Sequence, residues 1–121
     1  MSTHPIALNS NQALGLEEAA RGFAAVGSEP RLAIVLTLVR AGPEGLTVGE
    51  IQERVGFPAS TLAHHLRFLV EAGLLDQQKR GRAVVNRAVF EHVEALARFL
   101  VQACCADARA SGVETAGGGN P

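Results

Sequence analysis

The stretch that decides the fold is LTVGEIQERVGFPASTLAHHLRFLVEAGLL, residues 46–75. Its first part predicts a short helix that begins after Thr47, because Glu50 three residues later completes a capping box. Gly56 permits a tight turn, after which a proline opens a second helix that is expected to run to about Ala72. The stretch therefore predicts two helices of unequal length joined by a glycine turn.

The longer of these helices has two different faces. Leu62, Leu66 and Leu69 recur at helical spacing and predict a buried face, which Val70 extends. The opposite face carries Ser60, Thr61, His64 and Arg67, with His65 nearer the edge. Short polar and basic side chains of this kind fit the major groove of DNA, so the pattern predicts the recognition helix of a helix-turn-helix unit. The alternative interpretation is a helix face that simply meets solvent.

A β-hairpin with a basic tip is expected directly after this helix. The segment LLDQQKRGRAVVNRAVF, residues 74–90, contains β-branched residues, and Lys79, Arg80 and Arg82 surround a glycine at its middle. Residues 58–88 hold five basic residues against two acidic ones, whereas the whole chain has a net charge of −1. The chain is therefore no general binder of polyanions, but its hairpin is expected to contact backbone phosphates or the adjacent minor groove.

Further helices are expected on both sides of this unit. Apolar residues recur at helical spacing from about residue 12 to 26, and SEPRLAIVLTLVRAG, residues 28–42, predicts a helix that is apolar nearly all round and should lie in the core. A last helix is expected over residues 90–107. Its apolar stripe comprises Phe90, Val93, Leu96, Ala97, Leu100, Val101 and Cys104. The predicted fold is mainly α with a small β-hairpin, a winged helix-turn-helix in the order α-α-α-α-β-β-α.

Length and composition predict one domain. The chain has 121 residues, of which 47% are hydrophobic and 19% charged. We expect a flexible tail at residues 1–12, the folded domain at 13–107 and a second, glycine-rich tail at 108–121. No secretory signal or membrane span is recognised, and two adjacent cysteines form no disulfide framework, so a cytoplasmic protein is expected. No catalytic triad, phosphate loop or HExxH pattern is present in the sequence, so no enzyme is expected.

The segment PASTLAHHLRFLVEAGLLDQQKRGRAVVNRA, residues 58–88, resembles the recognition helix and wing of the ArsR/SmtB family of winged-helix repressors. SEPRLAIVLTLVRAGPEGLTVGEI, residues 28–51, resembles the second and third helices of that family. The likeness covers residues 13 to about 104. It implies a homodimer built from the first and last helices, which binds a double-stranded, pseudo-palindromic DNA operator without a cofactor. It also implies repression that a bound metal ion or an oxidant releases.

Members of this family bind their inducers at different places, and most of these places are unmatched here. The cysteine motif of the third helix would need thiols around Thr47 and Gly49. The zinc site of the last helix would need a partner for His92 at position 103, which is alanine, so His92 is expected to be simply exposed. The persulfide-type sensors use two well-separated cysteines, which adjacent residues do not match.

The variant that matches has a vicinal cysteine pair near the end of the last helix. Cys104 and Cys105 match that pair, and Ser111 stands where a third thiol is expected. Trivalent arsenic is soft and binds three ligands, of which a monomethylated arsenical already holds one as carbon. The resemblance therefore implies a trivalent arsenical as inducer, either arsenite or methylarsenite. Ser111 either favours the methylated form or leaves arsenite bound by two sulfurs and a hydroxide.

Other interpretations of the two thiols stay open. Cys104 lies on the apolar stripe, so packing alone accounts for it, whereas Cys105 lies about 100° further round the helix. A thiol-based redox-sensing repressor and a winged-helix protein that binds DNA without a ligand are the alternatives. His64 and His65 are adjacent, but neighbouring side chains diverge on a helix, which favours DNA contact over metal binding.

Overall fold

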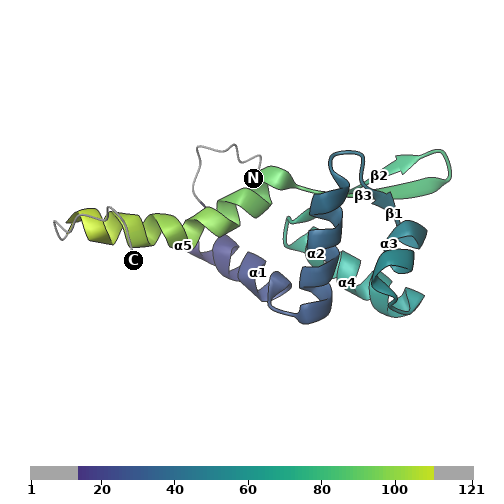
Figure 1. Ribbon diagram of the computed structural model, residues 1–121, viewed down its shortest axis with the longest axis horizontal. Coiled ribbons are helices and arrows are strands. Elements are labelled where there is room, and N and C mark those ends of the chain that lie inside the picture. Colours follow the sequence, from purple (N-terminus) through teal and green to yellow (C-terminus); the bar gives the residue numbers. More distant parts are fainter. Residues whose placement is uncertain (1–13, 111–121) are drawn as a thin grey trace.

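The computed structural model describes residues 14–110 of the chain, with side chains through Gln102. Figure 1 shows helices α1 and α5 side by side at one end of the molecule, α2 in the middle, and α3 with the β-sheet at the other end. The predicted order of helices and strands is confirmed, with one additional short strand. The elements are α1 (Leu16–Val26), α2 (Glu29–Ala41), β1 (Leu46–Thr47), α3 (Val48–Val55), α4 (Ala59–Glu71), β2 (Leu75–Arg80), β3 (Ala83–Ala88) and α5 (Phe90–Ala110).

The helix boundaries follow from local capping. Ser28 Oγ accepts a hydrogen bond from the backbone N–H of Arg31 at 3.3 Å and starts α2. Thr47 Oγ1 accepts from the N–H of Glu50 at 3.2 Å, and Glu50 Oε1 accepts from the N–H of Thr47 at 2.9 Å, so the predicted capping box is confirmed. Gly56 has a φ of +79°, which ends α3 in the left-handed conformation that glycine adopts without strain.

The first helix begins later than the sequence pattern predicted. It starts at Leu16 rather than near residue 12, because Gly15 is its N-cap and Glu18 accepts the hydrogen bond of the Gly15 N–H. Leu14 is nevertheless buried, just before the helix. The predicted helix over residues 12 to 26 included Leu14, which the structure places outside α1.

The hydrophobic core is one cluster that joins α2, α3 and α4 and extends to α1, α5 and the sheet. Leu62, Leu66 and Leu69 of α4 are buried as predicted, and they pack with residues of α2 and α3 in one cluster. The expectation that α2 is buried all round is only partly confirmed, because Leu32 and Leu36 are 42% and 41% exposed. The buried face of α2 consists of Ile34, Val35 and Leu38.

The sheet has three strands in the order β1-β3-β2, and the pairs are antiparallel. The hairpin β2–β3 was predicted, but β1 was not. Asn86 of β3 is completely buried and holds this sheet together from inside. Its Nδ2 donates to the carbonyl of Leu46 in β1 at 3.3 Å, and its Oδ1 accepts from Gln77 Nε2 in β2 at 2.8 Å.

Helix α5 spans 21 residues and continues to Ala110, past the predicted domain end at residue 107. Its buried face is formed by Ala95 and Leu96, whereas Leu100 and Val101 of the predicted stripe are 62% and 59% exposed. No single helix within residues 14–110 is long and apolar enough to cross a membrane. Helices α1 and α2 meet that test only when joined, and they are bent by 99° relative to each other.

Candidate nucleic-acid interface

The outer face of α4 is exposed along its length. Ser60, Thr61, His64 and Arg67 all reach solvent, while the leucines on the opposite face of the helix are at most 2% exposed. Pro58 is the N-cap, and α4 therefore starts immediately before the polar residues. The core fixes the helix from behind and leaves these four side chains free to meet a partner, as the sequence predicted.

His65 lies apart from this group. Its side chain is partly buried, and its ring meets the ring of Phe57 edge-on with centroids 6.2 Å apart. Its Nδ1 is buried and has no hydrogen-bond partner among the described residues. Burial lowers the pKa of His65, and the neighbouring charges of Arg31 and His64 lower it further. His65 therefore packs behind the exposed face of α4.

The hairpin presents its basic residues at the tip. Arg80 of β2 pairs with Ala83 of β3, so the turn consists of Gly81 and Arg82, and Gly81 has a φ of +62°. Lys79, Arg80 and Arg82 are all exposed, and within residues 14–110 none of the three forms an ion pair with a carboxylate. Their positive charges are therefore available to an external anion.

Arg87 belongs to the same basic segment of the sequence but has an internal partner. It lies opposite Asp76 in the strand register, and its Nε and Nη2 donate to the two carboxylate oxygens of Asp76, each at 3.2 Å. The hydrogen bonds to Asp76 raise the pKa of Arg87. The positive charge of residues 58–88 is thus carried outward by four residues: Arg67, Lys79, Arg80 and Arg82.

The recognition helix and the hairpin adjoin each other. Arg67 of α4 and Gln77 of β2 line the same hollow, which has a volume of about 240 Å³. The exposed face of α4 therefore continues onto β2, and the basic hairpin tip extends from the same strand.

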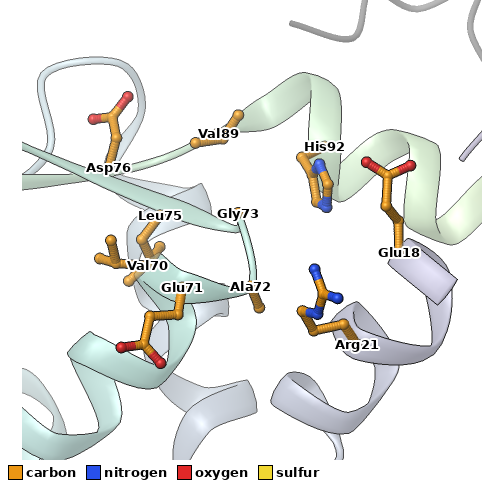
Figure 2. A pocket seen from close by; sticks show the side chains of 10 residues that line it. All are labelled: Glu18, Arg21, Val70, Glu71, Ala72, Gly73, Leu75, Asp76, Val89 and His92. Atoms are coloured by element: carbon orange, nitrogen blue, oxygen red, sulfur yellow. The ribbon is translucent and has the colours of Figure 1, made fainter. Parts of the chain in front are cut away.

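His92 of α5 is not exposed, contrary to the sequence-based expectation. Its ring lies against Gly73, where a Cβ would come within 3.3 Å of His92 Cε1, and burial lowers its pKa while the charge of Glu18 raises it. Figure 2 shows His92 and Arg21 directed toward one another in a cavity of about 490 Å³ between α1, the turn after α4, and α5. Sequence reasoning missed this cavity, because no local pattern signals that three separate elements meet there.

The cysteine pair lies near the C-terminal end of α5. The helix includes Cys104 and Cys105, but their side chains and Ser111 lie outside the described part of the chain. Among the described residues, no group of three or more His, Cys, Asp or Glu side chains could hold a metal ion. The predicted thiol site therefore stays a prediction.

Within residues 14–110, five helices, a capped helix–turn–helix at α3–α4 and a following β-hairpin define a winged helix-turn-helix protein. Residues 26–78 match the family model described as a helix-turn-helix domain. The chain is 40% identical over 60 residues to YceK of Bacillus subtilis, an uncharacterized HTH-type transcriptional regulator. That match spans 50% of this chain and 59% of the relative.

Solved structures of other proteins have the same fold, and some of them are described as ArsR-like regulators. An ArsR-like transcriptional regulator from Rhodococcus sp. RHA1 is 27% identical, with a TM-score of 0.69 over 79% of this chain and 88% of that one. HlyU from Vibrio cholerae is 28% identical, with a TM-score of 0.60 over 74% and 94% of the two chains. Mb0332 from Mycobacterium bovis, described as a homodimeric winged helix-turn-helix DNA-binding domain, is 21% identical, with a TM-score of 0.58 over 82% and 87%.

Proposed function

We propose that this protein is a homodimeric transcriptional repressor that binds double-stranded DNA through α4 and the hairpin. The observation that carries the proposal is the exposed face of α4, which is backed by buried leucines and adjoins a hairpin. The basic tip of that hairpin forms no ion pair with a carboxylate in the part of the chain that the structure describes. A helix of this kind fits the major groove, while a basic hairpin beside it reaches the phosphate backbone.

The side chains divide into two roles. Ser60, Thr61, His64 and Arg67 would contact base edges and nearby phosphates, because all four are exposed on α4 and can donate or accept hydrogen bonds. Lys79, Arg80 and Arg82 would contact phosphates or the adjacent minor groove. His65, which was grouped with the contacts in the sequence-based prediction, would support the helix through Phe57.

Exposed apolar side chains support the homodimer. Leu16 of α1 is 76% exposed, and Leu100 and Val101 of α5 are 62% and 59% exposed, although these two helices pack together within one chain. Large apolar side chains on neighbouring helices are typical of a protein–protein interface. Two copies joined here would present two α4 helices to half-sites about 34 Å apart on one face of DNA.

The test is selection of DNA by the full-length protein. A random duplex library is incubated with the protein, and bound DNA is recovered and sequenced. We expect the recovered DNA to share a pseudo-palindromic site. The mass of the protein–DNA complex should correspond to two chains per duplex. Replacing Thr61 and His64 together by alanine should abolish the selected consensus while the protein stays folded. Recovery of no consensus, or of a consensus that this variant retains, would contradict the proposal.

Trivalent arsenicals are the proposed inducers, bound by Cys104 and Cys105. The support is chemical: the two thiols are adjacent on α5, they are soft ligands, and a methylated trivalent arsenical needs only two such ligands. Because α5 carries both the thiols and the exposed residues of the proposed dimer interface, a ligand there can alter the spacing of the two α4 helices. A 100-fold loss of operator affinity needs a coupling free energy of only about 2.7 kcal/mol.

The inducer is tested by titrating the protein–DNA complex with arsenite, methylarsenite, zinc and peroxide in parallel. Release by methylarsenite at the lowest concentration is the expected result. Release by peroxide alone would identify a redox sensor, and release by none of the four would identify a repressor that acts without such a ligand. Both of these outcomes would overturn the arsenical proposal and leave DNA binding intact.

A further inference from the structure

Arg31 lies at the junction of three helices. It belongs to the first turn of α2, where its own N–H is held by the N-cap residue Ser28. Its guanidinium extends away from α2 and contacts both α1 and α4. Sequence reasoning assigned it no role, because its partners are far from it along the chain or belong to the backbone.

On one side the guanidinium closes the C-terminal end of α1. Arg31 Nε donates to the carbonyl oxygen of Ala25 at 2.6 Å, and Nη2 donates to that of Ala24 at 3.3 Å. The last carbonyls of a helix have no partner within the helix, and that end carries the negative part of the helix dipole. The last turn of α1 contains no basic residue of its own. Arg31 therefore supplies both the hydrogen bonds and the positive charge from the next helix.

On the other side the same guanidinium meets the recognition helix. Its carbon Cζ lies 4.1 Å from the centre of the Phe68 ring in α4, within the range of a cation–π contact. Phe68 directly follows Arg67 and is one helical turn beyond His64. A planar guanidinium can donate along its edge and stack with its face at the same time, which an ammonium group cannot do.

We propose that Arg31 is a positioning residue that fixes the orientation of α4 relative to α1. The proposal rests on the proposed function, in which α1 belongs to the dimer interface and α4 enters the DNA. In a dimer, the direction of each α4 relative to α1 sets the distance and angle between the two recognition helices. Arg31 thereby determines which half-site spacing the dimer accepts, without touching DNA.

The experiment compares three duplexes bound by the full-length protein. The first contains the two half-sites selected by the wild-type protein, the second has its spacer changed by one or two base pairs, and the third contains a single half-site. Arg31→Ala should weaken binding to the first duplex about tenfold, as expected for loss of one such contact. Binding to the single half-site should stay unchanged, so that the preference for the selected spacing shrinks.

Two further variants separate positioning from charge and from folding. Arg31→Lys keeps the charge but lacks the planar fork, and it should lose spacing preference like Arg31→Ala. Arg40→Ala removes an exposed arginine from the other end of α2, carries the same change in charge, and should leave the preference intact. Thermal melting identifies a variant that does not fold. If Arg31→Ala does not fold, the spacing preference of Arg31→Lys decides whether Arg31 positions α4.

Phe68→Leu tests the stacking contact directly. As a single substitution it should reduce the spacing preference. The double variant with Arg31→Ala should have the same spacing preference as Arg31→Ala alone, because both changes break the same contact. Two results would overturn the positioning role and leave the proposed function standing. The first is that the Arg31 variants lose the same factor of affinity for the single half-site as for the duplex with two half-sites. The second is that their spacing preference is unchanged. If the wild-type protein selects no DNA, the proposed function fails and the positioning role fails with it.

Discussion

Gly22 of α1 lies so close to Leu96 of α5 that a Cβ on Gly22 would come within 2.9 Å of Leu96 Cδ1. Both residues are buried, and the contact joins the two helices that carry the exposed apolar residues of the proposed dimer interface. The absence of a side chain at position 22 therefore sets how closely α1 and α5 approach each other.

Gly22→Ala should destabilise the fold. Overpacking of this kind costs about 1–3 kcal/mol, and the better helix propensity of alanine returns about 1 kcal/mol at most. The measurement is urea unfolding at a fixed protein concentration. The matched control is Gly49→Ala in α3, where a Cβ meets no atom within 4 Å. The free energy of unfolding of that control should rise by about 0.5–1 kcal/mol. A Gly22→Ala variant as stable as the wild type would show that α1 and α5 can move apart at little cost.

The salt dependence of DNA affinity should show whether the hairpin contacts phosphates. Arg80→Ala should weaken binding to all DNA sequences and make the slope of log K against log salt shallower by about 1, because one fewer counterion is released. Arg87→Ala is the control within the same hairpin, since Arg87 is held by Asp76 and should leave that slope unchanged. Equal slopes for Arg80→Ala and the wild type would remove the hairpin tip from the DNA interface.

Local signals in the sequence were sufficient for most of the fold. The capping box of Thr47 and Glu50 and the leucines of α4 act over a few residues, so their pattern predicted the helix-turn-helix correctly. Strand β1 has only two residues, too few to show alternation. It pairs with β3, which lies about 40 residues later in the chain, and the Asn86 side chain adds a hydrogen bond to Leu46.

The candidate site was predictable to the same extent. Exposure of Ser60, Thr61, His64 and Arg67 follows from helical spacing, since they lie opposite the leucines. The pairing of Arg87 with Asp76 depends on the strand register, and the burial of His92 depends on α1, α5 and the turn after α4 coming together. These are tertiary relationships, which spacing along the chain does not encode.

Two partly buried histidines should make stability depend on pH. Burial lowers the pKa of His65 and of His92 below the ordinary value of 6.5. As pH falls through that value, the unfolded chain binds protons that the folded chain does not yet bind, so the free energy of unfolding decreases. The decrease should begin near pH 6.5 and end below the lowered pKa values. It is measured by urea unfolding between about pH 5.5 and 7.5.

Replacing these histidines should flatten that profile. His92→Gln and His65→Gln each remove one group that must stay neutral in the folded protein, so each should reduce the pH dependence, and the double variant should reduce it most. A double variant with the full wild-type pH dependence would show that other groups cause it.

The cysteine pair gives the sharpest test of ligand chemistry, because thiols can be both removed and added. Cys104→Ser with Cys105→Ser should still bind DNA but no longer release it when methylarsenite is added.

Ser111→Cys in the otherwise unchanged chain supplies a third thiol at the position where the resemblance expects one. Because arsenite takes three thiolates and methylarsenite two, this variant should respond to arsenite at a much lower concentration, while its response to methylarsenite changes little. Fluorescence anisotropy of labelled operator DNA measures both responses. Release from the double serine variant, or an unaltered arsenite response with Ser111→Cys, would place the sensing site away from the end of α5.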